Sequence, residues 1–233
     1  MFIDALRGAP RPFVMEIKRT DGEGRPLTGD RSVASLVEAY TAAGAPCLSV
    51  VTGHWFGGTP DLLAEVAART TLPLLQKDFI TRSEQLRTAR SLGASAVLLT
   101  AGLLPRSALH RLIGAALDLE LTPFVEVVAD SEIAGLPHAE ACVVAVNNKD
   151  INTRERTGDG VERSLRLLPA VLNSGAGCPV SASGIDTPQT AARLLSAGYT
   201  GLLVGTSLLR TDNLTTWLAT FDSELDATDP GRS

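Results

Sequence analysis

The chain has 233 residues, of which 44% are hydrophobic, and its 21 Lys and Arg against 26 Asp and Glu give a formal net charge of −5. This size and apolar content suffice for the core of one domain, while an acidic balance without a basic block argues against a nucleic-acid partner. No apolar run approaches the ~20 residues of a membrane span, and residues 1–7 are too short and too charged for a signal peptide. We therefore expect a cytoplasmic protein without a membrane partner. The oligomeric state stays open, with a monomer as the working expectation.

Cysteine and histidine usage agrees with this expectation. The three cysteines, Cys47, Cys142 and Cys178, are isolated from one another in the sequence. Two of them fall in expected strands. A small, buried hydrophobic role in a reducing compartment is the simplest interpretation of such residues. The three histidines lack the spacing of metal ligands and are typical of loop or surface positions: His54, His110 and His138. The sequence thus predicts neither a metal site nor a cofactor.

Eight short apolar runs divide the chain, and they begin near Phe13, Cys47, Pro73, Ala96, Pro123, Ala141, Pro179 and Gly201. Their hydrophobicity is nearly continuous, which is typical of strands buried on both faces of a parallel sheet. Amphipathic stretches that we expect to be helices follow the runs, at residues 32–43, 60–69, 83–91, 105–119, 161–172, 187–197 and 213–225. The fifth crossover, residues 130–138, is short and has room for about one or two helical turns.

The alternation of strand and helix fits a single closed (β/α)8 TIM barrel better than an open sheet. Glycines follow three of the expected helices, where the chain must reverse into the next strand: Gly44, Gly93 and Gly198. The predicted barrel domain spans residues 1–225. Residues 226–233 form a polar tail containing Asp229-Pro230-Gly231, which we expect to be a frayed terminus.

Polar residues end several of the expected strands, and in a (β/α)8 barrel these carboxyl ends converge on the mouth that holds the active site. The residues in question are Glu16, Lys18, Lys77, Glu126, Asn147 and Asn148. Because an unpaired buried charge is costly, the charged ones must either pair with one another or face the wet mouth. A lysine and a carboxylate held close can also divide acid and base roles between them. The asparagines add neutral groups that can orient a substrate.

Two neighbouring loops after the seventh and eighth strands combine glycines with hydroxyl groups. They read Ser183-Gly184-Ile185-Asp186-Thr187-Pro188 and Gly205-Thr206-Ser207. Barrels commonly build a phosphate site at this corner from backbone N–H groups and a short helix. The alternative is that the glycines only turn the chain while the hydroxyls cap helices. The occurrence of two such loops on adjacent strands favours a phosphate site.

Six of these segments, in their order along the chain, resemble the motifs of the indole-3-glycerol phosphate synthase family. They are Glu16-Ile17-Lys18-Arg19, Gln76-Lys77-Asp78-Phe79, Phe124-Val125-Glu126-Val127, Val146-Asn147-Asn148-Lys149-Asp150, Ser181-Ala182-Ser183-Gly184-Ile185 and Val204-Gly205-Thr206-Ser207-Leu208. The resemblance runs from about Phe2 to the last helix. It implies a (β/α)8 carboxy-lyase of tryptophan biosynthesis that closes 1-(2-carboxyphenylamino)-1-deoxyribulose 5-phosphate into an indole, with loss of carbon dioxide and water.

The resemblance also implies roles for individual residues. Lys77 matches the general acid that protonates the ketone oxygen during ring closure. Lys18 matches a lysine that contacts the substrate carboxylate and assists the acid chemistry, with Glu16 positioned as its partner. Glu126 matches the carboxylate that removes a proton in the later dehydration, and Asn147 matches the asparagine that holds the anthranilate-derived part.

The remaining matches concern binding. The phosphate grip of the family corresponds to Ser183, Gly184, Gly205, Thr206 and Ser207. Lys149 stands where the family has an arginine, so it is a substrate-binding candidate that lacks the planar guanidinium fork.

Three further departures from the family pattern bear on specificity. The family's Ser-Pro-Ser-Lys-Gly loop is replaced by the segment Arg19-Thr20-Asp21-Gly22-Glu23-Gly24-Arg25, which adds negative charge where an anionic substrate is expected. Ala182 replaces a glutamate of the seventh strand, which removes a carboxylate from the mouth. The chain also begins about a dozen residues before its first strand, so that the family's amino-terminal extension is not expected.

Three interpretations follow from the sequence. The chain is an ordinary synthase; or it is a paralogue in specialised biosynthesis that acts on a different amino-deoxyketose phosphate; or it is a non-catalytic barrel that binds a sugar phosphate or a partner protein. The third interpretation is disfavoured because the chain keeps all five central polar residues of the family pattern, Glu16, Lys18, Lys77, Glu126 and Asn147. A phosphoribosyl anthranilate isomerase fits less well, because that relative uses a cysteine at the first strand end, where this chain has Glu16 and Lys18.

Overall fold

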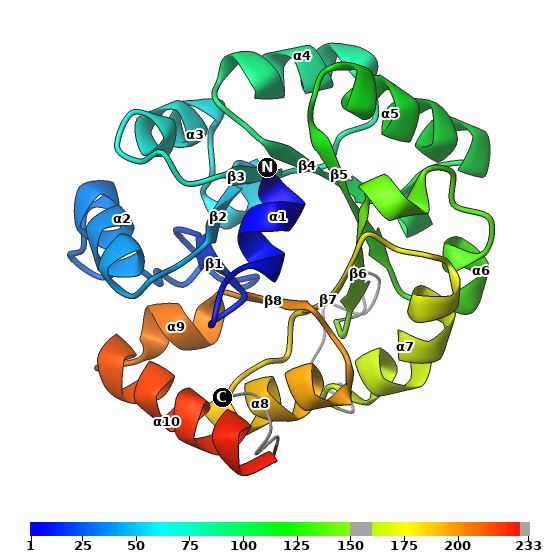
Figure 1. Cartoon of the computed structure of the whole chain (residues 1–233). Helices are drawn as coiled ribbons and strands as arrows, with labels where there is room; N and C mark the ends of the chain where they lie inside the picture. Colours follow the sequence, from blue (N-terminus) through cyan, green and yellow to red (C-terminus); the bar gives the residue numbers. More distant parts are fainter. Residues whose placement is uncertain (150–159, 229–233) are drawn as a thin grey trace.

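The computed structural model describes residues 1–149 and 160–228. Within them, eight parallel strands form a closed barrel in sequence order, and β1 pairs with β8 to complete the ring (Figure 1). The strands are β1 (Phe13–Ile17), β2 (Cys47–Val51), β3 (Leu74–Lys77), β4 (Ala96–Thr100), β5 (Thr122–Val127), β6 (Val143–Asn147), β7 (Cys178–Ala182) and β8 (Gly201–Val204). The predicted (β/α)8 fold is confirmed.

Helices surround the barrel where the sequence predicts them. They are α2 (Val33–Ala42), α3 (Pro60–Ala67), α4 (Ser83–Ser91), α5 (Arg106–Asp118), α6 (Asp130–Ile133), α7 (Glu162–Asn173), α8 (Pro188–Ala197) and α10 (Leu214–Thr228). The short α6 agrees with the expectation for the fifth crossover. Local capping explains two of the starting points, because the side chains of Ser32 and Thr187 each accept a hydrogen bond from the backbone three residues on.

Most boundaries lie within one or two residues of the prediction, and two of the differences change the local structure. A 3-10 turn, η3 (Ala139–Ala141), occupies the start of the run expected at Ala141, and the strand begins only at Val143. Helix α10 continues to Thr228 instead of ending at Leu225, and the hydroxyl of Thr228 donates to the backbone carbonyls of Glu224 and Leu225. The first residues of the expected tail are therefore helical, and the rest of the expected frayed terminus, with Asp229-Pro230-Gly231, lies outside the described residues.

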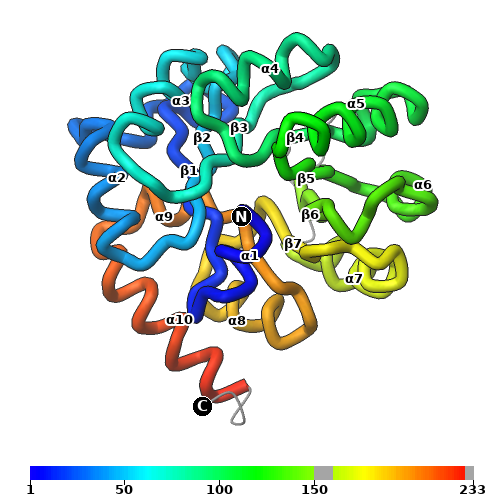
Figure 2. Tube along the Cα trace, turned by 45° about the horizontal axis from the view of Figure 1, so that its top comes forward, coloured from blue at the N-terminus to red at the C-terminus, as the bar shows by residue number. Residues whose placement is uncertain are grey.

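Helix α1 (Phe2–Arg7), which the sequence did not predict, lies across the end of the barrel where the strands begin (Figure 1). Figure 2, turned by 45°, shows it across the same end. Its buried Phe2 packs edge-on against Phe124 of β5, with ring centroids 6.4 Å apart. Strand β8 begins with Gly201 because a Cβ atom there would lie 2.6 Å from Leu6 Cδ2. The helix thus closes the end of the barrel where the strands begin, and a functional site is expected at the opposite end, where the strands finish.

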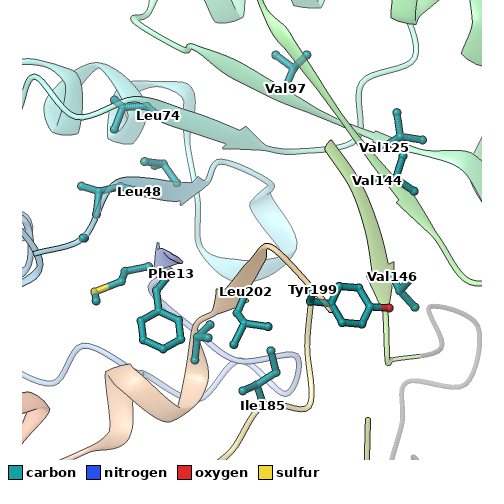
Figure 3. Close-up of a cluster of buried hydrophobic side chains, with 14 of the residues drawn as sticks. Phe13, Leu48, Leu74, Val97, Val125, Val144, Val146, Ile185, Tyr199 and Leu202 are labelled. Atoms are coloured by element: carbon teal, nitrogen blue, oxygen red, sulfur yellow. The ribbon is translucent and has the colours of Figure 1, made fainter. Parts of the chain in front are cut away.

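Side-chain alternation along the strands divides the core into two layers. Inward positions form a barrel-filling cluster with α1, which includes Val14, Cys47, Leu75, Leu98, Phe124, Ala145, Val180, Ala182 and Leu203. Outward positions pack against the helices, as Figure 3 shows for Phe13, Leu48, Leu74, Val97, Val125, Val144 and Leu202. On this outer layer Phe13 contacts Phe221 of α10, with ring centroids 4.6 Å apart. The alternation fixes which residue of each strand end faces the interior.

All three cysteines are buried and free, as the sequence predicts. Among the described helices, none has the length and apolar character needed to cross a membrane.

Candidate active site at the barrel mouth

The candidate catalytic side chains occupy the inward positions at the strand ends. Glu16 follows Val14 by two residues, Lys77 follows Leu75, Glu126 follows Phe124 and Asn147 follows Ala145, all in the inward series. The two carboxylates are almost fully buried, at 3% exposure for Glu16 and 4% for Glu126. Strand geometry therefore brings together the central residues that the sequence singled out.

The carboxylate of Glu16 lies between two ammonium groups. Its Oε1 atom is 3.2 Å from Nζ of Lys18, and its Oε2 atom is 3.7 Å from Nζ of Lys77. Burial raises the pKa of Glu16, but the charges of Lys77 and Lys18 outweigh it, so that this pKa lies below its ordinary value. Burial lowers the pKa of Lys77, yet Glu16 and Glu126 outweigh it and raise this pKa overall. Glu16 and Lys77 are consequently held in their charged forms.

The pKa of Glu126 lies above its ordinary value, in contrast to that of Glu16. Burial raises its pKa more strongly than Lys77 and a hydrogen bond with Asn147 lower it, and the charges of Glu16 and Glu132 add to the rise. The mouth thus holds a protonated lysine beside a carboxylate whose affinity for protons is increased. The two buried carboxylates, Glu16 and Glu126, have pKa values shifted in opposite directions, which is the pattern expected when two carboxyl groups have different roles.

These charges form a network and also face the mouth, so both possibilities left open by the sequence apply. The side chain of Lys77 is 23% exposed, and that of Lys18 is 14% exposed, whereas Glu16 beneath them is buried. The ammonium groups can therefore be reached from solvent while the carboxylate supports them from below.

The two loops expected to bind phosphate lie at the neighbouring ends of β7 and β8. Ser183 and Gly184 both adopt positive φ angles, of 66° and 69°. The hydroxyl of Thr206, the first residue of α9 (Thr206–Arg210), accepts a hydrogen bond of 3.3 Å from Nζ of Lys18. The hydroxyl of Ser207 donates to the carbonyl of Ile185 and ties the two loops together. Lys18 therefore connects this corner to the ion pairs around Glu16.

The two asparagines after β6 have different environments. Asn147 faces the interior and pairs in register with Ala182 of β7. The amide group of Asn148, which we expected to help to orient a substrate, makes its hydrogen bonds within the protein. Its Nδ2 atom donates to the carbonyls of Ala182 and Ser183, at 3.1 and 3.0 Å, and its Oδ1 atom accepts from the backbone of Ser164. Asn148 thus fastens the Ser183 loop to β6.

Lys149 is exposed, and its backbone N–H donates to Oδ1 of Asn147 at 2.9 Å. This places it at the rim of the mouth. Asp150, which follows it in the motif, lies outside the described residues.

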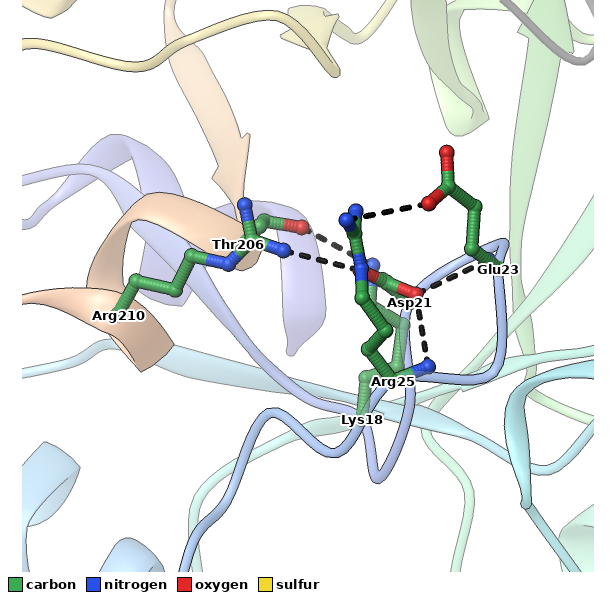
Figure 4. A network of polar contacts seen from close by, with 6 residues as sticks. All are labelled: Lys18, Asp21, Glu23, Arg25, Thr206 and Arg210. Carbon is green, nitrogen blue, oxygen red and sulfur yellow. Dashed lines mark hydrogen bonds and ion pairs between the residues drawn. The ribbon is translucent and has the colours of Figure 1, made fainter.

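The segment after β1 differs from what its sequence suggests. Asp21 does not place a free negative charge in the mouth, because its carboxylate is 2.8 Å from Nε of Arg25 and 2.9 Å from Nη2 of Arg210 (Figure 4). Glu23 also pairs with Arg25, at 3.1 Å. The hydrogen bond from Arg25 lowers the pKa of Asp21 to about 2. The rewritten segment thus supplies its own counter-charge, which reading it residue by residue did not predict.

An aromatic group beside the lysines was also missed. Trp55, on the turn η1 (His54–Phe56), is 55% exposed, stacks on His54 at 3.9 Å and meets the ring of Phe79 edge-on at 5.0 Å. The ring of Phe56 lies 5.6 Å from Nζ of Lys18. The available signal was the run His54-Trp55-Phe56, which begins three residues after the last residue of β2. Phe56 therefore offers an aromatic surface beside the Lys18 cation, and Trp55 and Phe79 form a further aromatic pair.

Within residues 1–149 and 160–228, no group of three or more His, Cys, Asp or Glu side chains could hold a metal ion.

Comparison with known proteins agrees with the geometry of a (β/α)8 lyase mouth. The family model for indole-3-glycerol phosphate synthase matches residues 1–221, and the chain belongs to this family. Proteins named indole-3-glycerol phosphate synthase from Polaromonas naphthalenivorans and Neisseria meningitidis serogroup C are 32% and 33% identical to it, over 91% of this chain and 80% and 82% of theirs. Indole-3-glycerol phosphate synthase 1 of Streptomyces coelicolor is 36% identical over 89% of this chain and 76% of its own.

Proposed function

We propose that this chain catalyses the reaction of its family, in which 1-(2-carboxyphenylamino)-1-deoxyribulose 5-phosphate is closed to indole-3-glycerol phosphate with release of carbon dioxide and water. Membership of the family supports this function. The observation in the structure that supports it best is the presence at one mouth of Lys77, 3.7 Å from Glu16, and of Glu126, whose pKa is raised by burial, because ring closure needs an acid and dehydration needs a base.

Binding of the substrate would use three parts of the mouth. The phosphate would lie at the corner formed by Ser183, Gly184, Gly205, Thr206 and Ser207. The substrate carboxylate would meet Lys18, and Lys149 at the rim would add a second cation. The anthranilate ring would rest against the surface of Trp55 and Phe79, with the Asn147 side chain beside its amino group. Each contact matches a group of the substrate in charge or polarity.

Ring closure forms a bond between the ring carbon that carries the carboxylate and the ketone carbon. The electron pair of the carbonyl moves to its oxygen, which takes a proton from the Lys77 ammonium. Glu16 keeps that ammonium charged before the reaction, and a cation near the developing oxyanion stabilises the transition state. Departure of carbon dioxide then returns its bonding electrons to the ring system and restores aromaticity.

Dehydration completes the reaction. Glu126 takes a proton from the methylene carbon beside the nitrogen, while the hydroxyl group on the former ketone carbon takes a proton from the Lys18 ammonium and its C–O bond breaks to release water. The raised pKa of Glu126 makes this carboxylate a better proton acceptor than an exposed glutamate. Lys77, which lost its proton in the first step, can receive one in this second step.

One observation favours a second candidate, a paralogue that acts on another amino-deoxyketose phosphate. Ala182, where the family has a glutamate, points into the interior next to Asn147 and is almost fully buried. A methyl group at this position changes both the charge and the space beside the proposed ring site. The third possibility, a non-catalytic barrel, has less support, because the charged residues are assembled and not merely retained.

Incubation of the purified protein with the carboxyphenylamino substrate, followed by mass spectrometry, tests the proposal. Formation of indole-3-glycerol phosphate with a turnover that depends on Lys77 would support the family reaction. Turnover of a different amino-deoxyketose phosphate, with none of this one, would support the paralogue.

A further inference from the structure

Residues 19–27, here called the Asp21 loop, are folded around a single carboxylate. The Oδ1 atom of Asp21 accepts from the backbone N–H groups of Glu23 and Arg25, at 2.9 and 3.0 Å. The backbone closes the turn with a hydrogen bond from Asp21 to Arg25 and a bridge between Thr20 and Pro26. The loop therefore has a defined shape that depends on one oxygen of Asp21.

The other oxygen of Asp21 connects the loop to a distant element. Its Oδ2 atom binds Arg210, which ends α9 and lies 189 residues away in sequence (Figure 4). Only 7% of Asp21 is exposed. A carboxylate so shielded needs a partner, and a guanidinium supplies charge and directional hydrogen bonds together. The contact is thus a tether between the loop and α9.

The same two segments meet again on either side of this tether. Before the loop, Nζ of Lys18 binds the hydroxyl of Thr206 at 3.3 Å. After it, the guanidinium of Arg31 binds the carbonyls of Leu27 and Leu209. Thr206 and Arg210 are four residues apart and therefore lie on one face of α9. A displacement of α9 at Arg210 would consequently also move Thr206.

We propose that Asp21 and Arg210 are positioning residues, whose ion pair holds the Lys18 ammonium against Thr206 and so sets the affinity of the mouth for a phosphorylated, anionic substrate. This inference rests on the proposed function. The loop that departs from the family pattern serves substrate binding from a distance, by fixing its neighbours, and neither residue touches the substrate.

The test compares two arginines that bind the same oxygen of Asp21. Arg210→Gln cuts the tether, while Arg25→Gln removes a contact within the loop and leaves the tether in place. We expect Arg210→Gln to raise KM for the carboxyphenylamino substrate by about 10-fold with little change in kcat, since misplaced binding groups weaken binding. The control Arg25→Gln should change KM by less than about 2-fold.

A second probe is inorganic phosphate, whose dissociation constant is obtained from thermal protection of each protein. This constant should rise in Arg210→Gln and in Asp21→Asn, which keeps the Oδ1 acceptor of the turn but loses the charge. Arg210→Lys, with one retained cation, should restore part of the affinity. Equal effects of the two glutamine variants, or an unchanged KM and phosphate affinity in Arg210→Gln, would overturn the proposal.

The two proposals fail differently. If the wild-type protein forms no indole product but Arg210→Gln still weakens phosphate binding, the proposed reaction is wrong and the positioning role of the Asp21–Arg210 ion pair is supported. If the wild type turns over and Arg210→Gln binds substrate and phosphate normally, the tether is wrong and the reaction stands. If Arg210→Gln does not fold, Asp21→Asn and Arg210→Lys decide the matter by the same two constants.

Discussion

Gly205 at the end of β8 lies so close to Glu16 on β1 that a Cβ atom added to it would overlap with Oε1 of the carboxylate and lie 3.0 Å from its Cδ atom. The glycine is therefore required by the buried anion on which both lysines depend. Absence of a side chain at one strand end makes room for the charge at the next.

Gly205→Ala should displace Glu16 and weaken its ion pairs with both lysines. We expect kcat/KM to fall by about 10- to 100-fold, because small displacements of catalytic groups have effects of this size. Steady-state kinetics on the carboxyphenylamino substrate measure it. Gly114→Ala is the matched control, since nothing lies within 4 Å of a Cβ atom there and the site is inside α5. That variant should keep its activity and gain about 0.5–1 kcal/mol of stability from helix propensity. Wild-type activity of Gly205→Ala would show that Glu16 is not so constrained.

Glu16→Gln should change the pH dependence of activity. Glu16 is the larger of the two influences that raise the pKa of Lys77, while burial lowers it. Loss of that charge should lower the pKa of Lys77, so that the lysine loses its proton at a lower pH. The alkaline limb of the kcat/KM profile should then shift towards lower pH, with the acid limb less affected. An unchanged alkaline limb would mean that Lys77 does not govern it.

Asp21→Asn should alter the acid stability of the protein. The pKa of Asp21 is about 2 in the folded chain, against about 3.9 for an unfolded aspartate. A lowered pKa stabilises the fold above the unfolded value, and this contribution disappears as the pH falls from about 4 towards 2. The free energy of unfolding of the wild type, measured by urea titration, should therefore decrease over this range more than that of Asp21→Asn. Parallel curves for the two proteins would contradict the ion pair.

Ala182→Glu tests whether the mouth has kept the family substrate. The added carboxylate would lie in the interior beside Asn147 and would favour the charged forms of the nearby lysines. If the alanine arose by a substitution that did not change the substrate, Ala182→Glu should increase indole formation. If the mouth is shaped for another substrate, activity on the family substrate should stay negligible in the variant and the wild type alike. Strong indole formation by the unmodified protein would contradict altered specificity.

A companion variant changes the Asp21 loop together with Ala182. Replacement of residues 21–24 by Ser-Pro-Ser-Lys removes Asp21 and, with it, the contact to Arg210. Combined with Ala182→Glu, it should recover indole formation only if the mouth still accepts the family substrate. A further loss of substrate affinity in the combined variant, compared with Ala182→Glu alone, would agree with the positioning role of Asp21.

The sequence was sufficient to predict the barrel and the position of its central polar residues at the mouth. A polar residue two positions after an inward hydrophobic one, as in Leu75 and Lys77, must also point inward at the strand end. The same alternation places Glu126 and Asn147. For these residues, strand periodicity and the rule that strand ends converge on one mouth are enough.

Contacts between distant segments could not be predicted in this way. The charge of Asp21 suggested a negative mouth, and only the fold shows that Arg210 neutralises it. Asn148 reads like its neighbour Asn147, yet outward alternation directs it to the backbone of β7. Helix α1 is too short for its periodicity to identify it, and its burial depends on the open barrel end that it closes.

A single-turnover experiment with substrate labelled in its carboxylate examines the division of labour between Lys77 and Glu126 most directly. Lys77→Met should slow carbon dioxide release and indole formation together, by the ~10²–10⁴-fold that general acid catalysis typically contributes. Glu126→Gln should release carbon dioxide at close to the wild-type rate and accumulate the hydroxylated intermediate, with indole formation slowed. Loss of carbon dioxide release in Glu126→Gln, normal turnover in Lys77→Met, or the absence of indole-3-glycerol phosphate from the wild-type reaction would contradict the proposed mechanism.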